Sequence, residues 1–417
     1  MTVLVDFEWE GSRLTVHATC EEGEPKRDTP KLAQTTFFVD LELLHFIEDV
    51  HPDHLALVSI LVFRPWISKS ITFNRPISKK MANVIKNQGI KVHPIDERLE
   101  SYKPNGHGYI GLAYSGGADS TAALAVLPST TVPVFLDRPE RSKSLYAKDA
   151  ALASCSKLKK IGYRVQTVPC DLESVREPIG FPTDLANGVP AILLSKRMNL
   201  TGISFGTVFE SLYGIGRTKF KDYEITSHKK MWWDLFEAAG LPLSFPVGGV
   251  SEVGTELICA KSPFESLARS CIRGTIDEPC NNCWKCFRKT TVRQALGLQP
   301  KNPELIKQLL ASKEVRMKLS KLPISHEDVL LYSFSKLGFE GYPGDFRQRF
   351  SYLRDFTCLE CWYPPSLNYI HSSLRQSVQQ RMNMYLETMT TSQQEQAESW
   401  NLEPILPNLS ALYQDDH

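Results

Sequence analysis

Short apolar segments alternate with amphipathic segments through the middle of the chain. The expected elements, in chain order, are a strand at 109–114, a helix at 120–127, a strand at 132–136, a helix at 142–161, a strand at 163–168, a helix at 186–197, a strand at 202–206 and a helix at 228–239. Strands that alternate with helices are typical of a parallel sheet with crossover helices on its faces. The pattern therefore predicts an α/β fold with a doubly wound parallel sheet.

The two flanking parts of the chain show different patterns. The segment 101–108 is rich in Pro, Asn and Gly and is predicted to be a linker. The expected elements of the flanks are strands at 2–9, 14–19 and 55–63, and helices at 78–87, 303–312, 327–337 and 367–395. We predict three domains, which are an N-terminal α+β domain over 1–105, the parallel-sheet domain over 106–298 and a C-terminal helical domain over 299–417.

Composition and charge limit the cellular compartments and the binding partners that can be expected for this chain. Of 417 residues, 42% are hydrophobic and 23% are charged, as in ordinary globular proteins, and the formal net charge is +1. Such a balance gives no electrostatic argument for nucleic acid or an anionic membrane as a partner. The first residues lack the pattern of a signal peptide, and the longest apolar run, 55–63, is far shorter than the roughly 20 residues of a membrane helix. We therefore expect a cytoplasmic protein, in which clustered cysteines are metal ligands or redox groups rather than disulfides.

The loop "SGGADS", residues 115–120, lies between an expected strand and an expected helix. Its glycines let backbone N–H groups approach a ligand, and the N-terminus of a helix favours an anion. Ser115 and Ser120 can donate hydrogen bonds to phosphate oxygens, and Asp119 would be explained by a bridging Mg²⁺ or by capping of the helix. The pattern predicts a phosphate-binding loop, and the alternative is a glycine-rich turn with an Asp or Ser cap. No lysine follows the glycine pair, as one would in a Walker-type loop.

This loop resembles the PP-loop, S-G-G-x-D-S, of the ATP pyrophosphatase superfamily, and it matches every defined position. The resemblance implies that ATP is cleaved between its α- and β-phosphates when a substrate oxygen attacks the α-phosphate, after which an N or S nucleophile displaces AMP. It implies catalytic roles for Asp119, Ser115 and Ser120. The next strand would end beside adenosine, although an ordinary strand end is the alternative there. The expected nucleotide contacts are Tyr114, Ser115, Gly116, Gly117, Ala118, Asp119, Ser120, Leu136 and Asp137.

Four cysteines lie close together near the end of the predicted central domain, with the spacing C-x8-C-x2-C-x2-C. They are Cys271, Cys280, Cys283 and Cys286. Four thiolates at such spacing satisfy a tetrahedral Zn²⁺, and four protein ligands indicate a closed, structural site. An iron–sulfur cluster is the alternative metal centre, because four cysteines suit it equally well. Four unrelated buried cysteines are the alternative without a metal.

The loop and the cysteine cluster together resemble 7-cyano-7-deazaguanine synthase over residues 109–297. That family makes a nitrile from 7-carboxy-7-deazaguanine, ammonia and ATP, and it has a four-Cys zinc site at the end of its domain. The resemblance implies a substrate loop in "GTVFESLYG", with Gly206, Glu210 and Tyr213 as substrate contacts. Packing within the loop is the alternative role for the last two.

The chain also departs from that family. Asn281 stands where the family usually has a glycine, and "LDRPER", residues 136–141, replaces an Asp-Tyr-Gly-Gln pattern at a strand end. The segment "SEVGTEL", residues 251–257, lacks the lysine of the corresponding helix start. The resemblance is therefore stronger for the ATP half than for the substrate half, and the long flanks indicate a specialised relative that acts on another carboxylate or a larger partner.

The sequence thus predicts an ATP-dependent adenylating ligase that uses ATP, Mg²⁺ and Zn²⁺. It would activate a small-molecule carboxylate or carbonyl as an adenylate for attack by ammonia or an amine. A tRNA-modifying sulfur transferase of the same superfamily is one alternative, and a nucleotide-sensing or partner-binding protein without turnover is another. The flanking domains would carry a protein partner if there is one. Nucleic acid and membrane are not expected, and a homodimer is left open.

Overall fold

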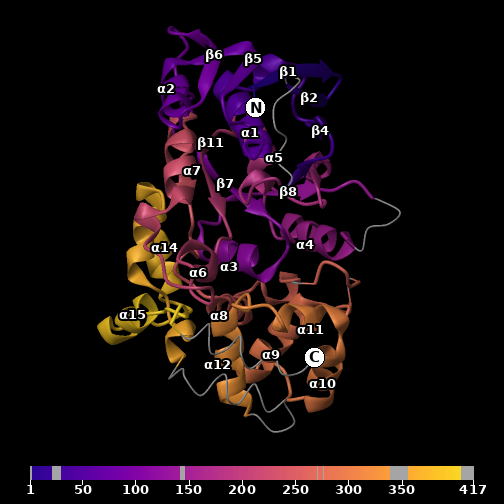
Figure 1. Ribbon diagram of the computed structural model, residues 1–417, viewed down its shortest axis with the longest axis vertical. Coiled ribbons are helices and arrows are strands. Elements are labelled where there is room, and N and C mark those ends of the chain that lie inside the picture. Colours follow the sequence, from indigo (N-terminus) through magenta and orange to yellow (C-terminus); the bar gives the residue numbers. More distant parts are fainter. Residues whose placement is uncertain are drawn as a thin grey trace.

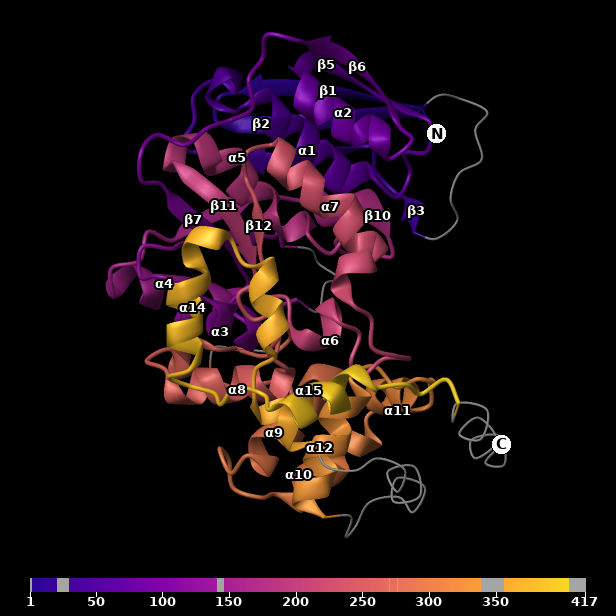
Figure 2. The ribbon, with the colours of Figure 1, turned by 90° about the vertical axis from the view of Figure 1, so that its left-hand side faces the viewer.

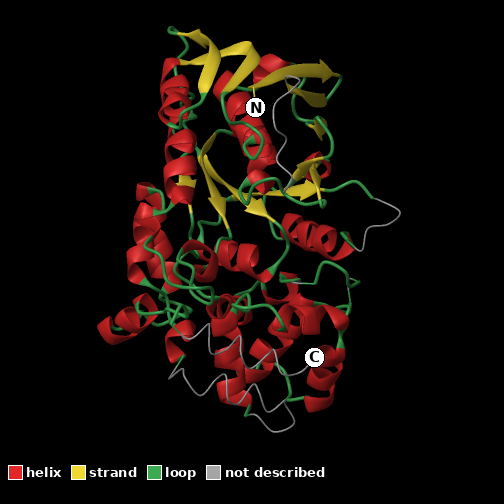
Figure 3. Cartoon of the chain, viewed as in Figure 1, coloured by secondary structure: helices red, strands yellow, loops and turns green. Residues whose placement is uncertain are grey.

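The computed structural model describes residues 2–20, 30–140, 146–269, 271–275, 277–338 and 356–404. The molecule is elongated, with the N-terminal sheet at one end, the parallel sheet in the middle and the helices between residues 284 and 337 at the other end (Figure 1). The strands lie in the upper half of this view, and helices and loops make up the lower half (Figure 3). Among the described helices, none is both long enough and apolar enough to cross a membrane.

The N-terminal part is a five-stranded mixed sheet with strand order β4-β2-β1-β5-β6. Its strands are β1 (Thr2–Glu10), β2 (Arg13–Cys20), β4 (Thr36–Asp40), β5 (Ser70–Ser78) and β6 (Lys91–Asp96), and its helices are α1 (Pro52–Phe63) and α2 (Lys79–Asn87). In β1, the side chains of Val3, Val5 and Phe7 are buried and alternate with exposed neighbours, because successive strand residues point to opposite faces. The short strand β3 (Lys31–Leu32) pairs instead with β10 (Arg176–Glu177), near the central sheet.

The predicted strand at 55–63 is wrong, because these residues form most of helix α1. All of them are buried, so the apolar run has no exposed face whose period would distinguish a helix from a strand. The helix start does have a local signal, in which Pro52 follows His51 and the His51 ring accepts a hydrogen bond from the Asp53 N–H at 3.1 Å.

The central sheet is entirely parallel, with strand order β12-β11-β7-β8-β9. Its strands are β7 (Tyr109–Tyr114), β8 (Val132–Asp137), β9 (Gln166–Pro169), β11 (Leu200–Phe205) and β12 (Leu243–Ser244). The predicted parallel α/β arrangement is therefore confirmed. The chain builds outward from β7 through β8 to β9, and then crosses to the other side of β7 to add β11 and β12. The strand order thus reverses between β7 and β11, which is where open parallel sheets place a ligand crevice beyond the carboxyl ends.

Helices cover both faces of this sheet. The connecting helices are α3 (Ala118–Val126), α4 (Asp149–Lys160), α5 (Val189–Met198), α6 (Phe209–Leu212) and α7 (Ser227–Ala238). One buried cluster joins Leu112 and Phe135 of the sheet to side chains of α3 and α4, and another joins Val134 and Ile203 to α5, α7 and α1. The helix predicted at 142–161 begins at Asp149, and residues 142–145 lie outside the described part of the chain.

The part beyond the sheet is helical. Its helices are α8 (Glu252–Lys261), α9 (Trp284–Ala295), α10 (Pro303–Ala311), α11 (Lys313–Leu319), α12 (Glu327–Leu337), α14 (Arg375–Met382) and α15 (Thr391–Glu398). Short 3₁₀ turns lie at Ile47–Asp49, Leu172–Val175, Ala186–Gly188, Tyr223–Ile225, Glu265–Leu267, Thr357–Glu360, Pro364–Tyr369 and Ser372–Leu374. Figure 2 shows α14 beside α3, so this late segment returns to the central sheet. One hydrophobic core runs from β1 to α12 across the predicted boundaries near 105 and 298.

The long polar helix predicted at 367–395 is wrong, because the segment is divided between 3₁₀ turns and the separate helices α14 and α15. The buried side chain of Trp362 explains the break between the two helices. Its backbone N–H donates to the Glu387 carbonyl at 3.0 Å, and its own carbonyl accepts from the Met389 N–H at 3.0 Å. Its indole N–H donates to the Asn383 side chain at 2.9 Å. The backbone between α14 and α15 therefore bonds to Trp362 instead of continuing a helix.

Candidate functional site

The loop 115–120 joins the end of β7 to the start of α3. Gly116 has φ +74°, and a Cβ placed there would lie 3.1 Å from the Cα of Ala151, so a glycine is required on both counts. Gly117 is the N-cap of α3 and no side chain caps the helix, so the predicted alternative of an Asp or Ser cap does not occur. The first N–H groups of α3, including that of Ala118, are thus left without a side-chain cap at a place that favours an anion.

The two serines of the loop bond to each other. The hydroxyl oxygens of Ser115 and Ser120 lie 3.1 Å apart, and the Ser120 hydroxyl donates to the Gly117 carbonyl at 3.2 Å. Gly206, just after β11, lies against them, since a Cβ at this position would stand 2.7 Å from the Ser120 nitrogen. The ends of β7 and β11 therefore meet at the loop, and Gly206 is needed for this close approach.

A cavity of about 720 Å³ opens at this junction. Ser115, Asp119, Ser120 and Gly206 line it on the side of the loop. On its other side, the connection between β11 and α7 contributes Arg217, Lys219 and Lys221, the segment before α5 contributes Asp184, and α7 contributes His228. Lys219 is paired with Glu403, and the His228 ring lies 2.8 Å from Asp184. By sequence alone the three basic residues are typical of a solvated face, and Asp184 and His228 carry no local signal.

The expected substrate contacts divide between the cavity and the core. Gly206 lines the cavity, whereas Glu210 and Tyr213 are buried and are not among its lining residues. The Glu210 carboxylate accepts a hydrogen bond from the Glu252 N–H at 2.7 Å, and burial, with the nearby Asp328 and Glu252 charges, raises the pKa of Glu210. The Tyr213 ring stacks with Phe220, with ring centres 5.5 Å apart. Their neighbours in the same segment, Ser211, Leu212 and Gly214, line the cavity instead.

A second, smaller pocket of about 280 Å³ lies on the other side of the loop. Tyr114, Ser115, Gly117 and Leu136 line it, as expected for a nucleotide, but Asp137 does not. Asp137 pairs instead with Lys148 at 2.8 Å. The Tyr114 hydroxyl bonds to Ser154 and Thr121, and burial raises the pKa of Tyr114 to about 12.

The pocket also contains side chains that the sequence did not indicate. The Arg138 guanidinium lies over the rings of Tyr146 and Phe181, at 4.4 and 5.1 Å from their centres, and pairs with Glu173 at 2.7 Å. Arg269 and Lys285 line the pocket on the side of the cysteines. These residues come from separate segments and converge only in the folded chain, so no local pattern could have identified them.

Asp119 lies in the first turn of α3 and faces the cavity. Its Oδ1 accepts a hydrogen bond from the Thr255 hydroxyl at 3.1 Å and lies 3.6 Å from Nζ of Lys289. Its side chain is 36% exposed. The carboxylate is therefore held by α8 and α9 on one side and open to a ligand on the other.

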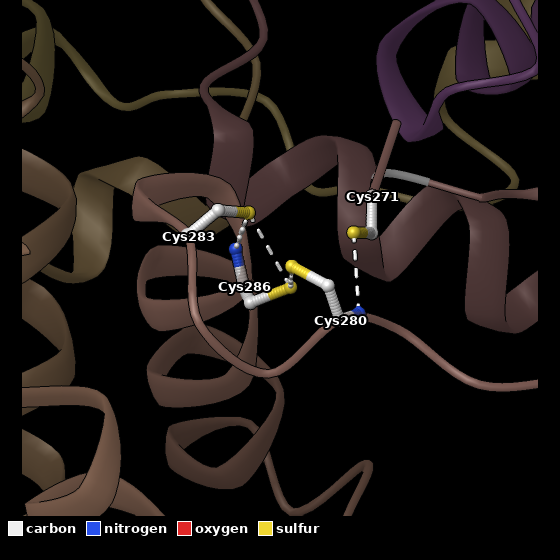
Figure 4. Close-up of side chains that lie close together, drawn as sticks. All are labelled: Cys271, Cys280, Cys283 and Cys286. Atoms are coloured by element: carbon white, nitrogen blue, oxygen red, sulfur yellow. Dashed lines mark hydrogen bonds between the residues drawn. The ribbon is translucent and has the colours of Figure 1, made fainter. Parts of the chain in front are cut away.

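The four cysteines converge as predicted. Their sulfur atoms all lie within 4.8 Å of one another and could hold a metal ion. The Sγ atom of Cys286 lies 3.5 Å from that of Cys283 and 3.7 Å from that of Cys280. Zn–S bonds of about 2.3 Å place sulfurs about 3.8 Å apart in a tetrahedron, so these spacings fit zinc. Cys283 is the N-cap of α9 and accepts from the Cys286 N–H at 3.4 Å, while Cys271 accepts from the Cys280 N–H at 3.4 Å (Figure 4).

The cysteine cluster adjoins the side of the loop that carries the smaller pocket. The Arg269 N–H donates to the carbonyl of Gly116 at 2.7 Å, and the Ala147 N–H donates to the Ile272 carbonyl at 2.7 Å. Cys271 itself lines the smaller pocket. The segment that carries the first cysteine therefore also supports the backbone of the loop.

A comparison with known protein families matches residues 231–401 to a family of unknown function, DUF6395. The matched part begins within α7 and includes the four cysteines, α8, α9 and α12, whereas the loop 115–120 lies outside it. No curated protein and no solved structure matches the chain.

Proposed function

We propose that this protein is an ATP-dependent adenylating ligase with a doubly wound fold of the PP-loop type. One observation carries the proposal. The "SGGADS" loop lies at the crevice where the strand order reverses, with an uncapped helix behind it and a pocket on each side. Ser115 lines both pockets, so the two ligands of a group transfer would meet at the loop.

The two pockets suggest how the substrates are arranged. The smaller one, between Leu136 and Tyr146, would take the nucleoside of ATP, and the cavity of about 720 Å³ would take the acceptor. An acceptor carboxylate oxygen then attacks the α-phosphorus, and the bond from that phosphorus to the bridging oxygen breaks to release pyrophosphate. Ammonia or an amine next attacks the acyl carbon, loses a proton and displaces AMP. The loop N–H groups and the serine hydroxyls would stabilise the phosphate charges.

The experiment that tests this proposal is product analysis. Mg·ATP and ammonium are incubated with the protein and a panel of carboxylates that includes 7-carboxy-7-deazaguanine. We expect AMP and pyrophosphate in equal amounts, and only with an accepted carboxylate. Asp119→Asn should abolish both products, whereas Asp137→Asn should retain them, because Asp137 pairs with Lys148 and lines neither pocket. ADP and phosphate as products, or bound ATP that yields no AMP with any carboxylate, would refute the ligase.

The four-Cys site is proposed to hold a structural Zn²⁺, which when bound would tie the segment of Cys271 to the start of α9. Metal analysis and an absorption spectrum distinguish it from an iron–sulfur cluster, which is coloured. We propose a cytoplasmic protein, because clustered cysteines act as metal ligands rather than as disulfides in a reducing compartment. Cys259, beside the loop, is buried and donates to the Ala118 carbonyl, so it does not offer the accessible thiol that a sulfur transferase would need.

A further inference from the structure

A cluster of opposite charges lies behind the loop, between α3, α8 and α9. We call it the ion cluster, and its members are Asp119, Glu252, Glu256, Arg288, Lys289 and Arg293. It contains three carboxylates and three cations, and a further, exposed carboxylate, Glu265, lies 3.5 Å from Arg293 at its edge. His326 also lies 3.2 Å from Glu252, but burial lowers the pKa of His326 to about 4 and keeps its ring neutral. Through Asp119, the ion cluster therefore connects the loop to α8 and α9.

Lys289 is the member that reaches the loop. Its Nζ lies 3.2 Å from Glu256, 3.6 Å from Glu252 and 3.6 Å from Asp119. Arg288 pairs with Glu252, and Arg293 pairs with Glu256 and with the exposed Glu265, so neither arginine pairs with Asp119. The side chain of Lys289 is 10% exposed. Burial by itself would lower the pKa of Lys289, but the three carboxylates outweigh that effect and raise it, so the ammonium stays charged.

A buried ammonium is unfavourable unless carboxylates surround it. Of the three carboxylates around Lys289, two come from α8 and the third is Asp119 of the loop. The loop has no lysine of its own. Lys289 of α9 therefore supplies the cation that lies beside the loop.

We propose that Lys289 is a positioning residue of the nucleotide site, which holds Oδ1 of Asp119 against α8 and α9 so that Oδ2 can bind the Mg²⁺ of ATP. Within the described part of the chain, both contacts of the Asp119 carboxylate, with Thr255 and Lys289, fall on Oδ1. Without Lys289, no cation of the cluster would contact Asp119. Repulsion by Glu252 and Glu256 would then rotate the Asp119 side chain away from α8 and α9. The inference rests on the proposed function, because its ligand is Mg·ATP.

The position of Lys289 in the helix links this role to the cysteines. Cys283 caps α9, Cys286 lies in its first turn, and Lys289 follows one turn later. The turn that gathers the sulfurs therefore also sets the direction in which Lys289 points.

The test is the affinity for Mg·ATP, measured by calorimetry on the full chain with its metal retained. Lys289→Met should weaken the affinity by about tenfold or more, and Lys289→Arg should recover most of it. The double variant Lys289→Met/Glu256→Gln restores the charge balance and should regain stability without regaining affinity. Arg293→Met is the matched control, because it removes a cation of the ion cluster that does not touch Asp119, and its affinity should stay within about twofold of the parent.

Two results would overturn the inference. One is an unchanged affinity for Mg·ATP in a folded Lys289→Met variant. The other is full recovery of that affinity in the double variant, which would show that Lys289 acts only through the net charge of the cluster. A Mg²⁺ titration gives a second readout. The amount of Mg²⁺ needed for half-maximal ATP binding should rise in Lys289→Met and not in Arg293→Met. If the parent protein itself binds no Mg·ATP, the proposed function fails, and that result is distinct from parent binding that is insensitive to Lys289.

Discussion

At the scale of single residues, the candidate site depends on side chains whose surroundings differ from what their type suggests. Glu210 and Asp328 are carboxylic acids in the core, and Gly216 packs so closely on Asp328 that a Cβ there would overlap Oδ1. Burial raises the pKa of Asp328 to about 7, with the Glu252 charge adding to the effect. Such groups carry a cost to stability that changes with pH.

We predict that Asp328 contributes stability that is lost as the pH rises from about 4 to 7, while buried histidines such as His326 contribute the opposite trend. Asp328 is protonated in the folded state below about pH 7 but ionises near 3.8 when unfolded, so the folded state binds the extra proton in this window and loses that advantage as the pH increases. Between pH 4 and 7, the stability of Asp328→Asn relative to the parent should therefore rise by roughly 3 kcal/mol. Urea unfolding at several pH values measures this. The exposed Asp184 gives the control Asp184→Asn, and an Asp328→Asn curve parallel to the parent would contradict the prediction.

Gly116→Ala should destabilise the protein by roughly 1–3 kcal/mol and weaken ATP binding. The backbone there has φ +74°, which alanine adopts at a cost, and the new methyl group would press on Ala151. Gly117→Ala is the matched control in the same loop, since Gly117 has φ −80° and its Cβ would meet only the Ser115 hydroxyl at 3.4 Å. Thermal unfolding of both variants measures the difference, and equal loss in the two would show that the strain at Gly116 is unimportant.

At the scale of elements, α9 connects the four-cysteine cluster to the loop. Cys283 caps it, its first turn carries Cys286, and its next turn carries Arg288 and Lys289, which pair with α8. Upstream of α9, the Arg269 N–H donates to the Gly116 carbonyl. The proposed metal site and the proposed nucleotide loop should therefore respond together when either is changed.

Loss of the metal should lower stability and nucleotide affinity in parallel. Cys283→Ser removes a ligand, so we expect loss of the bound metal and a decrease in unfolding free energy of more than about 3 kcal/mol. Cys361→Ser is the control, because Cys361 lies outside the cluster of four sulfurs. Atomic absorption measures the metal content, chemical unfolding measures the stability, and calorimetry measures the affinity for Mg·ATP. A Cys283→Ser protein that keeps its metal and its stability would exclude the zinc assignment.

At the scale of the whole molecule, C-terminal segments contact the cavity that the central part of the chain forms. The C-terminal part returns along the sheet, where α14 packs on α3 (Figure 2). The indole N–H of Trp400 donates to the carbonyl of Arg217, and the N–H of Leu402 donates to the carbonyl of Thr218, both at 2.7 Å. The cationic wall of the cavity is thus fixed by residues far away in the sequence.

Trp400→Ala should loosen this wall. Its loss removes the hydrogen bond to the Arg217 carbonyl and a buried ring, so trypsin should cut after Arg217, Lys219 and Lys221 several-fold faster than in the parent. Trp9→Ala in the N-terminal sheet should leave the cleavage rate at these sites unchanged. Limited proteolysis followed by mass spectrometry identifies the cuts. Equal rates in the two variants would show that Trp400 does not hold the segment.

The sequence by itself determined the features that depend on local order. Alternating strands and helices predicted the parallel sheet, the spacing of Cys271 to Cys286 predicted their convergence, and the loop 115–120 was predicted to join a strand to a helix. Neighbours in the chain decide these features, because turn geometry, helix capping and ligand spacing act over a few residues.

Only the tertiary structure decided the rest. The fully buried run 55–63 is a helix, the polar stretch 367–395 is broken around Trp362, and Glu210 lies in the core instead of the cavity. The contact between Asp119 and Lys289 likewise joins distant segments. Burial and charge pairing depend on which elements pack together, and two residues far apart in the chain carry no mark of the neighbour that each will meet.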